Sequence, residues 1–136
     1  MTSRPRARAA TLGDSDLLAR VHGAFNVASG TWPLAGMRSF GWIFGPKQDI
    51  KRDKWLVRTV AGLLVSAAWS QLRAGSSPEG RAHARRTGLG TALTLLTIDL
   101  VYVPRGRLRW THLLDASMEA AWIAAWLRAR TDPAGD

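Results

Sequence analysis

The side chains best suited to chemistry lie on one stretch near the C-terminus. They follow one another at spacings of 3, 4, 3 and 4, which places them on one face of a helix. That face carries an imidazole, two carboxylates and two indoles. A charge at the centre of a bilayer costs at least about 2.5–3.5 kcal/mol, so in a membrane helix we expect this face to turn into the bundle, with Glu119 deepest. The five residues are His112, Asp115, Glu119, Trp122 and Trp126.

Polar residues also interrupt the other apolar parts of the chain. His22 and Asn26 are four positions apart and share a helical face, while Arg58 and Asp99 stand alone in their segments. Arg58 could neutralise Asp99 or a carboxylate of the C-terminal stretch. The candidates for ligand binding or a polar core are therefore His22, Asn26, Arg58, Asp99, His112, Asp115, Glu119 and Trp122.

Three interpretations of these residues stay open. The first is structural, with ion pairs and hydrogen bonds that fix the register of the helices. The second is a cavity in which a buried carboxylic acid, its pKa raised by burial, holds or protonates a lipid-like substrate. The third is a metal or haem site formed by His22, His112, Asp115 and Glu119. Because the Glu-x-x-His motif of helical di-metal sites is absent, we expect no metal and no cofactor, and we assign no catalytic residue.

The elements that would position these residues are four apolar blocks separated by basic clusters. A helix needs about 20 residues to cross a bilayer core, and each block approaches this length. Residues 75–78, with sequence GSSP, are typical of a turn between two blocks. The pattern predicts four membrane helices at about residues 17–37, 55–73, 87–103 and 110–128, within a membrane domain at 17–128.

The alternative for the same blocks is a soluble, basic four-helix bundle. Charged residues interrupt every block, which favours this alternative. Against it, the third block reads TALTLLTI and offers no charged face, whereas a surface helix carries charges on one side. We therefore favour the membrane interpretation.

Composition restricts the classes of function. The 136 residues contain no cysteine, which excludes disulfide scaffolds, zinc ribbons and thiol catalysis. The 19 basic and 10 acidic residues give a net charge of +9, but most of the basic residues are divided among five clusters. No zinc-finger, KH or RRM signature is present, so we expect no nucleic acid. We expect the clusters to contact anionic lipid headgroups instead.

The ends of the chain are polar. Residues 1–16 are basic and then polar, without the apolar segment of a cleavable signal, and predict a disordered tail. Residues 129–136 predict a second tail. Four helices place both ends on the same side, and we expect the cytoplasmic side of a bacterial inner membrane, although the basic residues divide almost evenly between the two sides.

Several segments resemble a family of small, uncharacterised bacterial four-helix integral membrane proteins. The resemblance implies a four-helix membrane architecture, and it brings no activity and no functional residues. The segments are VHGAFNVASGTWPLAGMRSF (Val21–Phe40), FGPK (Phe44–Lys47), WLVRTVAGLLV (Trp55–Val65) and DLVYVPRGRLRWTHLLDASMEAAW (Asp99–Trp122).

Together these observations predict an all-α fold. We expect a four-transmembrane-helix bundle running up-down-up-down, with a short interfacial segment, Ser39–Ile50, between the first two helices. The expected function is that of a small multi-pass membrane protein, a binding or accessory subunit with a polar intramembrane core, which binds lipid and works as a homo-oligomer or in a larger complex. The alternative is a membrane enzyme that uses intramembrane carboxylates on a lipid or isoprenoid-like substrate. The sequence leaves enzymatic activity open and favours a non-enzymatic role.

Overall fold

The computed structural model describes residues 13–44 and 50–129, and these residues are helical apart from short connections. Parts of both expected tails, residues 1–12 and 130–136, lie outside the described residues, whereas Gly13–Asp16 begin the first helix. Five helices are described: α1 (Gly13–Ala35), α2 (Met37–Phe44), α3 (Ile50–Leu72), α4 (Pro78–Tyr102) and α5 (His112–Arg128).

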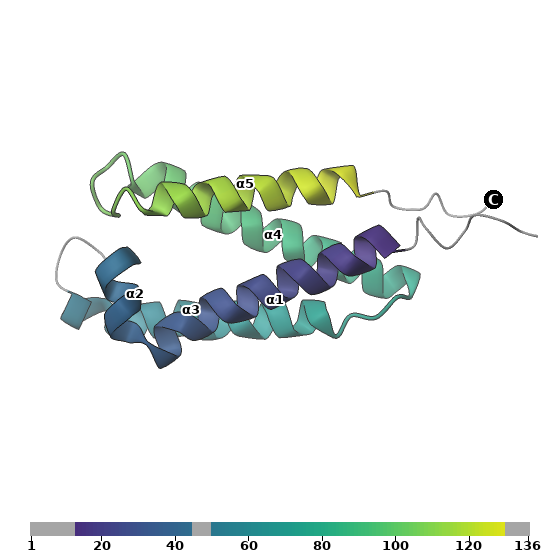
Figure 1. Cartoon of the computed structure of the whole chain (residues 1–136), viewed down its shortest axis with the longest axis horizontal. Helices are drawn as coiled ribbons and strands as arrows, with labels where there is room; N and C mark the ends of the chain where they lie inside the picture. Colours follow the sequence, from purple (N-terminus) through teal and green to yellow (C-terminus); the bar gives the residue numbers. More distant parts are fainter. Residues whose placement is uncertain (1–12, 45–49, 130–136) are drawn as a thin grey trace, which may run out of the picture.

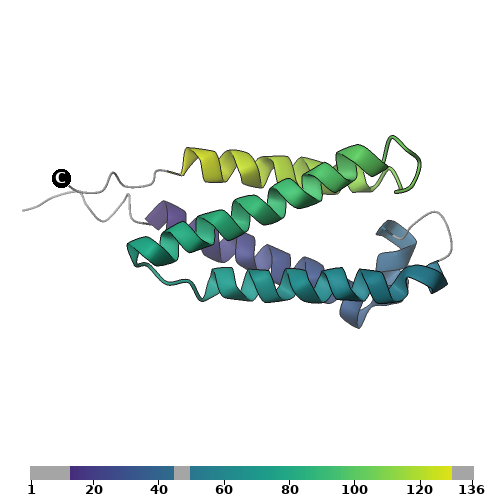
Figure 2. The same ribbon diagram turned by 180° about the vertical axis from the view of Figure 1, so that it is seen from behind.

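The four long helices run alternately in opposite directions along one axis, as Figure 1 shows. α1 packs closely on α3 and α4 packs closely on α5, whereas fewer contacts join these two pairs. The short α2 lies across one end of the molecule, beside the end of α1 and the start of α5 (Figures 1 and 2). The turn between α3 and α4 therefore connects the two pairs, and the loop between α4 and α5 closes the second pair.

Local chemistry sets the ends of the helices. Pro33 lies in the last turn of α1, two residues before the helix ends at Ala35. Ser77 caps α4, since its side chain accepts a hydrogen bond of 3.0 Å from the Gly80 amide, and Pro78 occupies the first turn, where no amide hydrogen is needed. Gly75 adopts a φ of 76°, which lets the chain turn between α3 and α4.

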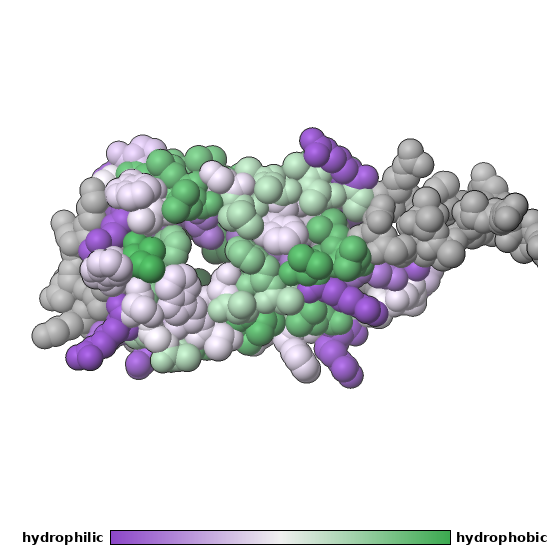
Figure 3. Space-filling model, viewed as in Figure 1, coloured by the Kyte–Doolittle hydropathy of each residue, from purple (hydrophilic) through white to green (hydrophobic). Residues whose placement is uncertain are grey.

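The interior is built from small and polar side chains. Among the residues that the structure describes, the buried apolar side chains are mainly alanines, together with Trp126. Five polar residues in the same part of the chain are also buried: His22, Asn26, Gln71, Asp99 and Glu119. Many large apolar side chains instead face outward on all the long helices, and Figure 3 shows apolar residues over much of the face that α1 and α5 form. The hydrogen-bonding atoms of a polar interior need partners, which these buried residues have to find within the bundle.

The prediction of four transmembrane helices was wrong. Among the residues that the structure describes, no helix is at once long enough and apolar enough to cross a membrane. The physical reason is that basic residues expected in connectors belong to the helices. α3 begins with the charged run Lys51–Lys54, α4 carries Arg81, Arg85 and Arg86 before its apolar part, and α5 has only 17 residues.

Three further expectations depended on membrane helices and are wrong with them. They are the multi-pass inner-membrane location, the role of a multi-pass membrane subunit with an intramembrane core, and the alternative of an intramembrane lipid enzyme. The interfacial segment is also corrected. In place of a segment lying in lipid, the structure has helix α2, whose Phe40 and Phe44 pack against Trp32 of α1 at ring-centre distances of 5.9 and 5.8 Å. Residues 45–49 of that segment lie outside the described residues.

Candidate functional site

Three potential metal ligands converge where α4 meets α5. Nδ1 of His112 lies 3.0 Å from Oδ1 of Asp99, and one ligand atom each from Asp99, His112 and Asp115 lies within 4.8 Å of the others. Asp99 stands one turn before the end of α4, and His112 is the first residue of α5. The loop between them turns at Gly106, which has a φ of 69°. The helix pair α4–α5 therefore brings together residues that are 13 positions apart in the sequence.

The hydrogen bond of His112 to α2 fixes the hydrogen on one nitrogen of its ring. Nε2 lies 2.9 Å from the backbone carbonyl of Phe44, at the end of α2. A carbonyl only accepts, so Nε2 carries a hydrogen and donates it. Nδ1 faces the carboxylates of Asp99 and Asp115, and its hydrogen bond of 3.0 Å to Oδ1 of Asp99 requires a hydrogen between these two atoms, which a metal ion bound at Nδ1 would replace. Histidine ligands of metal ions have this arrangement, with one nitrogen toward the ion and the other donating to a carbonyl or carboxylate.

The electrostatics of the cluster favour a positive charge at or beside the His112 ring. Burial lowers the pKa of His112, but its hydrogen bonds to Asp99 and Phe44 and the negative charges of Asp99 and Asp115 outweigh burial and raise this pKa overall. Burial and then the charge of Asp99 raise the pKa of Asp115 to about 6, although His112 opposes the increase. Carboxylates that gather around one imidazole either take up protons or bind a cation.

Glu119 extends the cluster along α5. It lies one turn beyond Asp115, and its side chain is 1% exposed. Burial, followed by the charges of Asp115 and Asp99, raises the pKa of Glu119 to about 8. Among the described residues, neither Oε2 of Glu119 nor Oδ2 of Asp99 has a hydrogen-bond partner. Arg58, the expected partner of these acids, is exposed on α3, and no ion pair joins it to them in the described part of the chain.

The other predicted residues form a second polar cluster, toward the end of the bundle where α5 finishes. Nε1 of Trp126 donates to Nδ1 of His22 over 3.0 Å, and the Asn26 amide lies 3.1 Å from Nε2 of the same ring. The ring of Trp122 stacks on His22 with a centre-to-centre distance of 4.6 Å. This cluster thus joins α5 to α1. Sequence reasoning missed Gln71, whose Nε2 lies 3.5 Å from Nδ1 of His22; the signal was a single amide at the end of an apolar run.

The ligand atoms fit a metal ion after a small adjustment. Zinc binds nitrogen and oxygen ligands at about 2.0–2.2 Å, so two ligands of one ion stand no more than about 4.4 Å apart. The ligand atoms of Asp99, His112 and Asp115 lie within 4.8 Å of one another, so they exceed this limit by no more than a few tenths of an ångström, which side-chain rotation can remove. The expectation of no metal rested on motifs within one helix, and such motifs do not include Asp99, which comes from a second helix.

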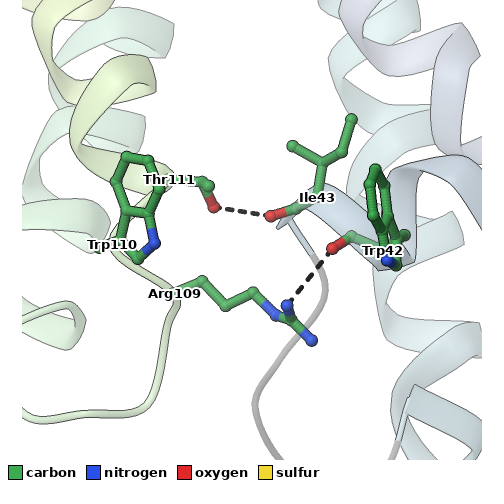
Figure 4. Close-up of a pocket in the computed structure, with 5 residues that line it drawn as sticks. All are labelled: Trp42, Ile43, Arg109, Trp110 and Thr111. Atoms are coloured by element: carbon green, nitrogen blue, oxygen red, sulfur yellow. Dashed lines mark hydrogen bonds between the residues drawn. The ribbon is translucent and has the colours of Figure 1, made fainter.

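A pocket opens at the same end of the molecule. Its volume is about 440 Å³, and Figure 3 shows the surface hollowed there between α5 and the layer that contains α1 and α2. In Figure 4 two hydrogen bonds span this region, from Arg109 to the Trp42 carbonyl and from Thr111 to the Ile43 carbonyl. The five lining residues are Trp42, Ile43, Arg109, Trp110 and Thr111.

Comparison with known proteins gives no relative from which to transfer a function: no family model, no curated protein and no solved structure matches the chain. The resemblance to small bacterial four-helix membrane proteins therefore gains no support from it. The expected partners, namely anionic headgroups, a second copy or a larger complex, stay predictions.

Proposed function

We propose that this protein binds one divalent metal ion through Asp99, His112 and Asp115. The observation that carries the proposal is the convergence of two carboxylates and one correctly oriented imidazole from α4 and α5 within 4.8 Å. Two ionised aspartates and one neutral imidazole carry two negative charges, and a divalent cation balances them. The unpartnered Oδ2 of Asp99, in a residue only 3% exposed, supports the same conclusion.

The ligand types restrict the choice of metal. Imidazole nitrogen together with carboxylate oxygen suits zinc, manganese, iron and cobalt, whereas a copper(I) site would need sulfur ligands. Three protein ligands leave at least one coordination position for water or a small ligand, as in catalytic rather than structural zinc sites. Buried Glu119, one turn along α5, stands next to this ligand set.

The experiment is calorimetric titration of the metal-stripped full chain with Zn²⁺, Mn²⁺ and Co²⁺. We expect one site per chain for at least one of these ions. Asp115→Asn removes a ligand charge with little change of shape, and it should weaken binding by more than the roughly 10- to 100-fold that an outer hydrogen-bond partner of a ligand is worth. His83→Ala is the matched control, because His83 is exposed and bonds to Ser70 away from the cluster.

Two results would contradict the proposal. One is the absence of stoichiometric binding for all three ions. The other is binding that survives in Asp115→Asn but disappears in His83→Ala, which would place the ion on the surface. Circular dichroism of each variant separates a lost ligand from a lost fold.

A further inference from the structure

Three consecutive backbone carbonyls at the end of α2 each accept a hydrogen bond from the start of α5 or the residues just before it. Thr111 donates through Oγ1 to the Ile43 carbonyl over 2.7 Å, and His112 donates through Nε2 to the Phe44 carbonyl over 2.9 Å. Nη1 of Arg109 donates to the Trp42 carbonyl over 3.3 Å. We call these three hydrogen bonds the α2 clasp, and two of them appear as dashed lines in Figure 4.

The clasp satisfies a physical need of α2. The last four carbonyls of a helix have no partner within it, and this end carries a partial negative charge. Arg109 brings a cation to that end, and His112 brings a polarised N–H group. α2 has only eight residues, which is too short to be stable alone, so these contacts contribute much of what holds it in place.

The hydroxyl of Thr111 forms its hydrogen bond with α2 and not with its own helix. It occupies the N-cap position of α5, where a threonine hydroxyl usually accepts a hydrogen bond from an amide of the first turn. Here it makes no such bond, and it adopts helical backbone angles of −56° and −26°. Removing the hydroxyl therefore takes away one of the three hydrogen bonds of the clasp without removing a cap from α5.

His112 connects the clasp to the carboxylate cluster. Nε2 reaches the Phe44 carbonyl on α2, while Nδ1 reaches Asp99 on α4. The carbonyl holds the hydrogen on Nε2, so the ring presents Nδ1 to Asp99 and Asp115. If α2 moved away, Nε2 would lose its acceptor and the ring could rotate or change tautomer.

From this juxtaposition we infer that α2 is the positioning element of the metal site. Thr111 and Arg109 hold the end of α2 so that the Phe44 carbonyl fixes His112 for coordination through Nδ1. This inference rests on the metal-binding function proposed above, and it adds that metal affinity depends on a hydroxyl that touches no ligand. Thr111 and Arg109 are thus positioning residues.

The test compares zinc binding by the full chain and three variants. Thr111→Val removes the hydroxyl and keeps the shape of the side chain, and Thr111→Ser restores a hydroxyl. Thr94→Val is the matched control, because the hydroxyl of exposed Thr94 donates within its own helix, to the Gly90 carbonyl. Calorimetry gives the affinity for Zn²⁺. Long-range ¹H–¹⁵N spectra of the His112 ring show which nitrogen is bound to zinc and which carries hydrogen.

We expect Thr111→Val to weaken zinc binding by about 10-fold or more. Its His112 spectrum should change from coordination through Nδ1 alone to a mixture of the two nitrogens. Thr111→Ser should recover most of the affinity and the original spectrum, and Thr94→Val should match wild type. Arg109→Gln removes the guanidinium that donates to the Trp42 carbonyl, and it should also weaken zinc binding. It replaces Thr111→Val in the test if that variant fails to fold.

The outcomes separate the two proposals. If wild type binds zinc, and Thr111→Val and Arg109→Gln keep its affinity and its ring spectrum, the inference is overturned and the proposed metal site still stands. Loss of affinity without a change in the ring spectrum would also overturn it, because general destabilisation explains that result. A wild-type protein that binds no zinc, manganese or cobalt would overturn the proposed function and the inference with it.

Discussion

Nε1 of Trp126, in the last turn of α5, donates a hydrogen bond of 3.0 Å to Nδ1 of His22 and so joins α5 to α1. An indole N–H only donates, so Nδ1 of His22 carries a lone pair, and the neutral ring has its hydrogen on Nε2. The side-chain amide of Asn26 must then turn its oxygen, and not its nitrogen, toward Nε2. This rotation by 180° also gives a hydrogen-bond partner to Oδ1 of Asn26, which otherwise has none among the described residues. This single ring thus commits α1 and α5 to one register.

The first prediction concerns acid stability. Burial lowers the pKa of His22 from 6.5 to about 4, so between these pH values the unfolded chain binds more protons than the folded one. Stability from His22 is complete above pH 6.5 and declines as the pH falls to about 4, by about 3 kcal/mol in total. Urea unfolding of wild type and His22→Gln should show a stability difference that shrinks over this range. A constant difference would contradict the neutral, hydrogen-bonded ring.

The second prediction concerns the space beside Trp126. A Cβ atom at Gly88 would lie 2.5 Å from Nε1 of Trp126, whereas one at Gly90 would have no neighbour within 4 Å. Gly88→Ala should therefore destabilise the protein by about 1–3 kcal/mol through overpacking. Gly90→Ala, on the open side of the same helix, should be neutral or stabilising by up to about 1 kcal/mol. Equal midpoints of thermal unfolding for the two variants would show that Trp126 does not pack against α4 as described.

The third prediction concerns Glu119 in the metal-free protein. Its pKa of about 8 in the folded state lies above the ordinary 4.5, so the folded protein binds more protons between these values. Stability should then decrease as the pH rises from about 4.5 to 8, because the buried acid must ionise. Glu119→Gln should melt close to wild type at pH 5 and above it at pH 9.

The control for this prediction is Glu79→Gln, since Glu79 is exposed in the first turn of α4. It should follow wild type at both pH values. If Glu119→Gln also follows wild type at pH 9, then Glu119 reaches water in solution and its burial in α5 is not maintained.

Part of the site follows from helical periodicity. The spacings of 3 and 4 along the C-terminal stretch identify the inward face of α5, on which Glu119 and Trp126 are buried. The meeting of Asp99 with His112 does not follow, because it depends on how the loop between α4 and α5 closes. Arg58 was the natural partner for the acids by charge, but its position on α3 turns it outward. The carbonyls of α2 leave no signal in the sequence, since every residue has one.

The membrane prediction failed for a related reason. Apolar blocks were delimited where basic residues began, as if a charged residue ended a helix. Backbone hydrogen bonding continues through such residues, and Ser77 starts α4 well before its apolar part, so that Arg81, Arg85 and Arg86 are helical. The turn expected at residues 75–78 marked the beginning of α4 better than hydropathy did.

The most direct test of the central claim is the position of the metal itself. Crystals of the zinc-loaded full chain, measured at the zinc absorption edge, give an anomalous difference map that locates the ion. We expect one peak about 2.0–2.2 Å from Nδ1 of His112 and from a carboxylate oxygen of both Asp99 and Asp115. A peak at exposed His83, or no peak at the α4–α5 cluster in protein saturated with zinc, would contradict it.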